Sequence, residues 1–85
     1  TTVAMETAST NPTLRNECHR IYDEWQQAFI EKLMASGMSD ARAQSIATLI
    51  IAGIEGGVIL CRTSQSRQPL EIIGEELYYV VKRAE

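Results

Sequence analysis

The 85-residue sequence predicts an all-α fold of three helices, at about residues 12–36, 40–63 and 69–84. Three observations predict it. Apolar residues recur with the 3.6-residue period of a helix, a start signal precedes each stretch, and no stretch alternates or ends in a hairpin turn as a strand would. Residues 1–10 are expected to be a lead-in segment, the end of a preceding helix or a loop, to one helical domain at 11–85.

The first helix is predicted by its start signal, its apolar arc and its stop signal. Asn11 suits the N-cap and Pro12 the first helical position, and Gly37 after Ser36 suits the left-handed residue that ends a helix. Between these signals, apolar side chains recur on one arc of roughly 140°. They are Leu14, Cys18, Ile21, Tyr22, Trp25, Ala28, Phe29 and Leu33.

The second helix follows the N-cap Ser39, and its apolar surface is too broad for one face. Its apolar and small positions together span roughly 200° of the circumference, whereas a surface helix needs a stripe of only about 100°. They are Ile46, Ala47, Leu49, Ile50, Ile51, Gly53, Ile54, Gly57, Val58, Leu60 and Cys61. This helix must therefore be covered from two sides, which two other short helices can hardly achieve alone.

The third helix opens at Pro69, and its charges match the helix dipole, with glutamates early and Lys82 and Arg83 late. The inner arc is expected to consist of Leu70, Ile73, Gly74, Leu77, Tyr78, Val80, Val81 and Ala84. Ile72 and Tyr79 lie on the opposite side, where two apolar residues on one edge indicate a partner surface.

Three glycines lie inside the second helix, where each costs about 1 kcal/mol relative to alanine. Gly53 and Gly57 stack on one side, one turn apart, and Gly56 lies between them. Missing side chains let two helix backbones approach closely. We favour a crossing between two copies of the chain over a crossing within one chain, with Gly74 as a possible counterpart; both alternatives stay open here.

The composition argues against several function classes. Eight basic against eleven acidic residues give a net charge of −3, with no basic stripe for nucleic-acid phosphates. Cys18 and His19 are adjacent and so point about 100° apart on a helix, which excludes a nucleophile–base pair between them. No spacing typical of a metal site is present, and no cofactor is expected. An enzyme is therefore not expected.

A membrane span is not expected either. The longest apolar run, residues 46–61, has 16 residues and contains Glu55, whereas a spanning helix needs about 20 apolar residues without a central carboxylate. Two cysteines without a disulfide framework favour free thiols in a reducing cytosol. The expected location is cytoplasmic.

The aromatic residues of the first helix permit two interpretations. Tyr22, Trp25 and Phe29 are core residues by default. Alternatively they line an apolar pocket for a flat or greasy molecule, a kind of site that is common between the helices of a bundle.

The order of these pieces resembles the C-terminal half of a TetR-type transcriptional regulator. The resemblance covers nearly the whole chain, and the succession of pieces carries it rather than any one motif. The pieces are TVAMETA at 2–8, NPTLR at 11–15, the helix with Tyr22 and Trp25, IAGIEGGVILCR at 51–62, PL at 69–70 and EL at 76–77.

This resemblance implies a helical domain that binds an inducer and forms a dimer. In such regulators the last two long helices usually pair with the same two of a second subunit in a four-helix bundle. DNA is bound by an N-terminal helix-turn-helix domain, which is expected to be absent from this chain. The resemblance places the ligand near Met5, Tyr22, Trp25, Phe29, Ile50 and Ile54. Together with the breadth of the second helix, it places the dimer interface at Leu49, Gly53, Gly57, Leu60, Ile73, Leu77 and Val80.

The predicted function is therefore the effector-binding and homodimerisation part of a TetR-like repressor. Its partners are a second copy, arranged with twofold symmetry, and an unknown small hydrophobic effector. The interface should bury roughly 1,500 Å² or more. The alternative is a stand-alone helical module for protein–protein interaction without a ligand. A small enzyme would need a polar constellation that the sequence lacks.

Overall fold

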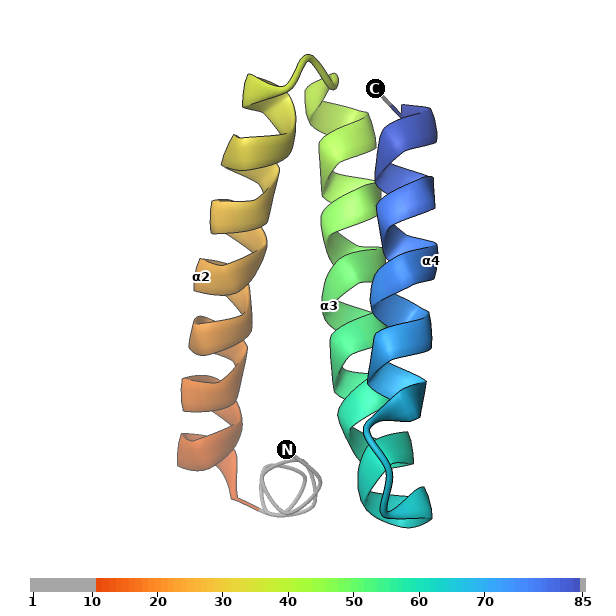
Figure 1. Cartoon of the computed structure of the whole chain (residues 1–85). Helices are drawn as coiled ribbons and strands as arrows, with labels where there is room; N and C mark the ends of the chain where they lie inside the picture. Colours follow the sequence, from red (N-terminus) through yellow and green to blue (C-terminus); the bar gives the residue numbers. More distant parts are fainter. Residues whose placement is uncertain (1–10, 85) are drawn as a thin grey trace.

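Three α-helices joined by two short turns make up the computed structural model of the chain, which describes residues 11–84 (Figure 1). The helices are α2 (Pro12–Ala35), α3 (Asp40–Ser64) and α4 (Gln68–Ala84). The predicted all-α class is confirmed for this part of the chain, and the predicted helix bounds agree to within one residue. The lead-in segment 1–10 lies outside the described residues.

The helix ends follow from local chemistry. The Asn11 side chain accepts a hydrogen bond from the Leu14 backbone N–H at 3.1 Å, and the Ser39 hydroxyl accepts one from Arg42 at 3.2 Å. Each cap satisfies a backbone donor that has no partner within its own helix. Gly37 takes a φ of +111°, as expected of the residue that ends α2.

One helix end differs from the expected pattern. Gln65, with φ 53° and ψ 41°, is the left-handed residue that ends α3, and the Ser66 N–H closes the turn onto the Cys61 carbonyl oxygen at 3.1 Å. Glycine or asparagine usually fills such a position, so a glutamine there does not signal the end of a helix.

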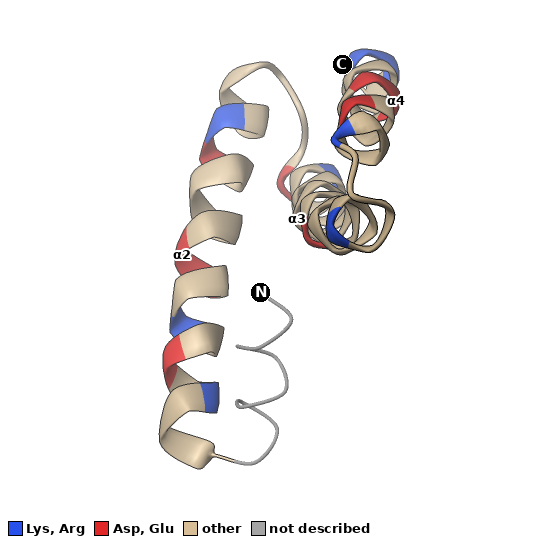
Figure 2. Cartoon of the chain, turned by 60° about the horizontal axis from the view of Figure 1, so that its bottom comes forward, with Lys and Arg blue, Asp and Glu red and all other residues tan. Residues whose placement is uncertain are grey.

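The three helices form a single layer with α3 in the middle. α3 contacts both α2 and α4, and the view nearly along α3 places the other two on different sides of it (Figure 2). The fold measures 39 × 31 × 13 Å along its principal axes. The smallest dimension is about the diameter of one helix with its side chains. Domains normally bury a core between at least two layers. Residues 11–84 supply no second layer on either face of this one.

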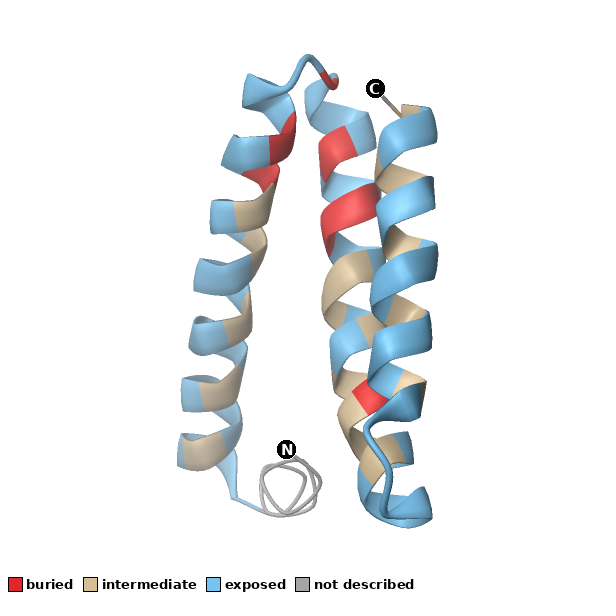
Figure 3. Cartoon of the chain, in the orientation of Figure 1, coloured by how far each residue is buried: buried red, intermediate tan, exposed pale blue. Residues whose placement is uncertain are grey.

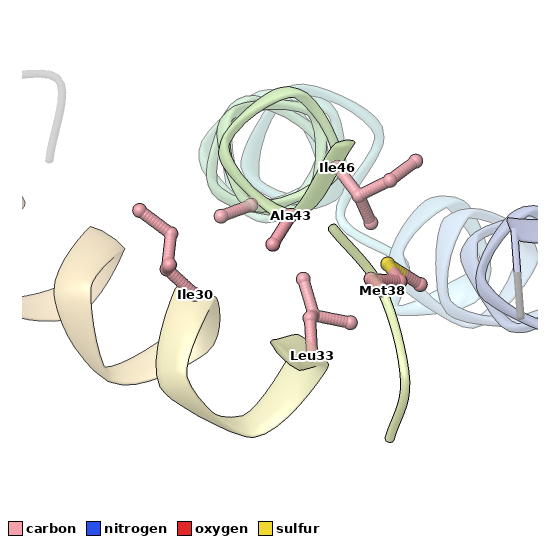
Figure 4. Close-up of a cluster of buried hydrophobic side chains, with 6 residues drawn as sticks. Ile30, Leu33, Met38, Ala43 and Ile46 are labelled. Atoms are coloured by element: carbon pink, nitrogen blue, oxygen red, sulfur yellow. The ribbon is translucent and has the colours of Figure 1, made fainter. Parts of the chain in front are cut away.

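The core is correspondingly small and lies at the end of the molecule where α2 turns into α3 (Figures 3 and 4). The buried apolar residues are Ile30, Leu33, Met38, Ala43, Ile46 and Ala47. Only four of the 25 residues of α3 are buried, namely Ala43, Ile46, Ala47 and Gly57. The helices of this chain thus cover α3 only in part.

The glycines of α3 divide into two kinds. A Cβ on Gly53 would lie 3.2 Å from side-chain atoms of Ile73 and Leu77, and a Cβ on Gly57 would lie 2.7 Å from Leu70 Cδ1. Because neither glycine has a side chain, α4 of the same chain can pack closely against α3 at both positions. A Cβ on Gly56 would meet nothing within 4 Å.

This geometry gives Gly53 and Gly57 a role within one chain, while their place at a dimer interface stays a prediction. Their close approach is a crossing within one chain, the alternative that the sequence disfavoured, and Ile73 and Leu77 take part in the same crossing. Gly74 is no counterpart, because it is exposed and a Cβ there would also meet nothing within 4 Å. Periodicity alone shows which residues share a face of a helix but not which helix covers that face.

Candidate functional site

The residues expected to bind a ligand lie on α2 and α3, and the structure distributes most of them over two hollows. Trp25, Phe29 and Ile54 line one hollow together, and Tyr22 lines the other. Ile50 packs instead against the buried core. Met5 lies outside the described residues.

The first hollow, which we call the Tyr22–Glu55 hollow, lies between α2 and α3 and has a volume of about 320 Å³. It combines polar and apolar side chains and is lined by Tyr22, Gln26, Thr48, Ile51, Ala52 and Glu55. Its volume falls at the lower end of the range typical of small-molecule sites.

Two polar side chains of this hollow are joined across the helices. Gln26 Nε2 on α2 donates to Thr48 Oγ1 on α3 at 3.0 Å, and Thr48 Oγ1 donates to the Gln44 carbonyl oxygen at 2.9 Å. The Thr48 hydroxyl thus both donates and accepts a hydrogen bond. These bonds tie α2 to α3 beside the hollow and fix the position of both side chains.

Glu55 has a different environment in the same hollow. Its Oε2 atom is shielded from solvent and receives no hydrogen bond from any of residues 11–84. A buried acceptor without a donor costs free energy. The carboxylate also acts on Tyr22: burial raises the pKa of the Tyr22 hydroxyl above its ordinary value of 10.0, and the charge of Glu55 and hydrogen bonding to it raise that pKa further.

The second hollow, which we call the Trp25 groove, is larger and almost entirely apolar. It has a volume of about 440 Å³ and is lined by Trp25, Ala28, Phe29, Lys32 and Ile54. The Trp25 side chain is 47% exposed, so it is not the core residue that its place on the apolar arc suggests.

The Tyr22 and Trp25 rings connect the two hollows. Each lines one of them, and their centroids lie 6.1 Å apart with the planes at 89°. This edge-to-face contact is a favourable arrangement for aromatic rings. A ligand that moves Tyr22 would therefore change the surroundings of Trp25 as well.

The residues expected at a dimer interface are also divided. Gly53, Gly57, Ile73 and Leu77 belong to the crossing of α3 and α4 described above, and Val80 packs against the core. Leu49 and Leu60 are 45% and 53% exposed. With Gly56 they lie on one side of α3, at positions i, i+7 and i+11, and we call these three residues the outer edge of α3.

Sequence comparison identifies the family. The model of the domain described as "Transcriptional regulator LmrA/YxaF-like, C-terminal domain" matches residues 1–76. The chain belongs to this family of TetR-type regulators. The match thus covers residues 1–76 of the 85 residues of this chain.

Curated relatives agree with this assignment. The chain is 37% identical over 81 residues to the HTH-type transcriptional regulator LmrA of Bacillus subtilis, and 35% identical over 81 residues to an uncharacterized HTH-type regulator, YxaF, of the same organism. Each match covers 95% of this chain but only 43% of LmrA and 42% of YxaF. A Mycobacterium tuberculosis HTH-type regulator is 26% identical over 57 residues, which are 67% of this chain and 29% of the relative. No solved structure matches the chain.

The relatives are transcriptional regulators and not enzymes. Within residues 11–84, no group of three or more His, Cys, Asp or Glu side chains could hold a metal ion. Cys18 and Cys61 are both free thiols. His19 lies on the surface of α2, with its Nε2 3.8 Å from an Asp23 carboxylate oxygen. In Figure 2 the blue Lys and Arg positions along the ribbon of α2 are separated by red Asp and Glu positions and form no continuous basic stripe.

α3 is long and apolar enough to cross a membrane by length and composition alone. Its most apolar window has a mean hydropathy of 1.7, and 17% of that window is buried in the fold. The core helix of a soluble protein passes the same test, but such a helix is mostly buried. Most of the apolar surface of α3 in this LmrA/YxaF-like domain is therefore not covered by the described helices.

Sequence reasoning missed most of the polar side chains of the site. It identified Tyr22 but not Gln26 or Thr48, and it used Glu55 only as an argument against a membrane span. A single carboxylate in a long apolar helix was the available signal, because such a group needs either a partner or a function.

Proposed function

We propose that this LmrA/YxaF-like domain binds a small effector between α2 and α3 and joins two copies of a regulator through α3 and α4. The effector regulates a repressor whose DNA-binding helix-turn-helix domain lies outside this chain, and the protein acts in the cytoplasm. The main observation in favour is the Tyr22–Glu55 hollow, which lies next to an exposed tryptophan and combines an apolar lining with a carboxylate.

The effector site is supported by its location and its chemistry. Pockets between helices are common ligand sites, and they combine mainly apolar walls with a few polar groups that orient the ligand. The two hollows flank the Tyr22–Trp25 ring pair and offer both kinds of surface. A module without a ligand would not need a half-exposed tryptophan beside a polar hollow.

Trp25 fluorescence tests this part of the proposal. A panel of flat aromatic compounds is titrated against the chain, and we expect at least one to change Trp25 emission in a saturable way. Ala28→Leu, which fills the Trp25 groove, should weaken binding of compounds seated there. Ala41→Leu, an equal change on the exposed start of α3, should leave it unaltered. Unchanged emission with every compound would favour the interaction module without a ligand.

The dimer is supported by the surface left bare on α3. The layer is one helix thick, and the two leucines of the outer edge are about half exposed. Gly56, which lies between them, weakens the helix by about 1 kcal/mol relative to alanine, yet no part of the described chain approaches it. A helix of a second copy against this edge accounts for the missing side chain and for the exposed leucines together. It also covers the apolar surface that a membrane would otherwise cover.

Sedimentation equilibrium tests the dimer. We expect the chain to be dimeric at micromolar concentration and the double variant Leu49→Glu/Leu60→Glu to be monomeric, because two charges would enter the interface. Ile21→Glu is the matched control, since Ile21 on α2 is a comparably exposed apolar residue at 39%. A wild-type chain that sediments as a monomer, or a double variant that stays dimeric, would contradict the proposed interface.

A further inference from the structure

Glu55 is a carboxylate with one shielded oxygen that has no hydrogen-bond partner among residues 11–84. Its carboxylate lines the Tyr22–Glu55 hollow, and Oε2 has neither solvent nor a hydrogen-bond donor from residues 11–84. A carboxylate has acceptor sites on both oxygens and satisfies them poorly when it is buried. Among residues 11–84 this acceptor is therefore in an unfavourable environment, which an added donor would relieve.

The other polar groups of the hollow do not supply that donor. The Gln26 amide donates to Thr48, and the Thr48 hydroxyl donates to the Gln44 carbonyl oxygen. Tyr22 faces the same carboxylate and still leaves Oε2 without a partner. The remaining lining side chains, Ile51 and Ala52, are apolar.

The carboxylate can reach a ligand without a change in the backbone. The last torsion of a glutamate side chain is soft, with a broad twofold preference. Rotation about it changes the direction of both oxygens, and Ile51 and Tyr22 line the same hollow as Glu55 and offer apolar contact to the rest of a ligand.

We propose that the effector of this domain is a flat apolar molecule with a hydrogen-bond donor on its edge, and that Glu55 accepts that hydrogen bond. This inference rests on the proposed function, and it specifies the ligand class of the same site. The donor is either a protonated amine or a neutral hydroxyl, since both can donate to a carboxylate. Hydrogen bonds to a charged acceptor are stronger than those between neutral groups, so the donor should dominate selectivity.

Three matched compounds test the inference: a naphthylmethylammonium, a naphthol and a methylnaphthalene. They share one flat ring system and differ in the group on its edge. Binding to the wild-type chain is measured at neutral pH by titration calorimetry and by NMR of the Ile51 methyl groups. We expect at least one of the two donor compounds to bind about tenfold or more tightly than methylnaphthalene. The donor compound that shows the preference identifies the chemistry of the effector.

Two variants assign the effect to Glu55. Glu55→Gln keeps the size of the side chain and removes its charge, and we expect the preference for the donor compound to fall to within about threefold. Glu75→Gln makes the same change on the exposed surface of α4 and should keep the full preference. Circular dichroism verifies that both variants retain the helices.

The outcomes distinguish a failure of this inference from a failure of the proposed effector site. Equal binding of all three compounds to the wild-type chain would overturn the inference and leave the effector site standing. A preference that survives in Glu55→Gln would overturn it as well. If none of the three compounds binds while other flat compounds still change Trp25 emission, the inference also fails and the effector site stands. If no compound of either set binds, both fail together.

Discussion

At the scale of single residues, the Tyr22–Glu55 pair is the most unusual feature of the domain. A phenol and a carboxylate face each other between two helices that are otherwise joined mainly by apolar contacts. The exposed ion pairs of α2 differ from this pair. Arg20 contacts Glu17 at 2.9 Å and Glu24 at 2.6 Å, but in solvent such pairs contribute little to stability.

The raised pKa of Tyr22 predicts a loss of stability at alkaline pH. Burial, first, and then Glu55 and Cys18 make the folded chain hold the Tyr22 proton more tightly than the unfolded chain does. The resulting stability is fully present below the unfolded pKa of 10.0 and is lost as the pH rises through the higher pKa of the folded state. Urea unfolding at a series of pH values from neutral to strongly alkaline measures this loss.

Tyr22→Phe assigns the loss to one residue. This variant should remove part of the decrease in the free energy of unfolding above pH 10.0, because it has no proton to lose at that position. Tyr79→Phe on α4 removes another tyrosine and serves as the matched control. Identical alkaline profiles for the wild type and Tyr22→Phe would show that the pair has no linkage to folding.

At the scale of the helices, two neighbouring glycines of α3 have different surroundings. The flank of α3 at Gly57 faces α4, and a side chain there meets Leu70 and Ile73. The flank at Gly56 faces open space in the single chain. Sequence spacing places both glycines in the same helix. It cannot show which helix packs against each flank, because that depends on the tertiary arrangement.

Leucine substitutions should separate these two roles. Gly57→Leu should lower the free energy of unfolding by about 1–3 kcal/mol or more, because the added side chain overpacks the crossing of α3 and α4. Gly56→Leu should leave the single chain as stable as before, or slightly more stable, because leucine favours a helix more than glycine does. It should nevertheless weaken the dimer.

Urea unfolding of dilute protein and sedimentation equilibrium measure these two effects separately. Gly53→Leu serves as a second substitution in the crossing and should behave like Gly57→Leu, because Ile73 and Leu77 lie close to it. A Gly56→Leu variant that dimerises like the wild type would remove Gly56 from the interface. A Gly57→Leu variant with unchanged stability would contradict the tight crossing.

How much of this domain can be predicted from sequence depends on how far apart in the chain the interacting residues lie. Helix starts at Asn11 and Ser39 depend on neighbours three residues away, so they were predicted correctly. The breadth of the apolar surface of α3 was also readable, since it depends only on composition and period. The crossing at Gly57 and the surroundings of Glu55 depend on residues from other helices, and no local pattern encodes them.

At the scale of the whole molecule, the single layer sets the stability. A chain of this size buries only about 60–65% of the surface of its unfolded form. Among residues 11–84, the six buried apolar residues gather at one end, and no large side chain is fully buried. Little of the free energy of folding can then come from the single chain, and a second layer supplied by another copy would add the missing burial.

This arrangement predicts that folding and dimerisation are coupled. If the folded state is a dimer, unfolding also separates two chains, and the midpoint of thermal unfolding must rise with protein concentration. Each tenfold increase in concentration favours the dimer by about 1.4 kcal/mol. Differential scanning calorimetry over a hundredfold range of concentration should therefore show a steady rise of the midpoint for the wild type.

The Leu49→Glu/Leu60→Glu variant tests whether the concentration dependence of the midpoint comes from the outer edge of α3. With the outer edge of α3 charged, we expect a lower midpoint that no longer depends on concentration, since only the small core of one chain remains. Ile21→Glu should keep the concentration dependence of the wild type, because Ile21 lies on α2, away from the outer edge of α3. A wild-type midpoint that is the same at all concentrations would mean that one layer of helices is stable alone, and that the exposed leucines of α3 serve another partner.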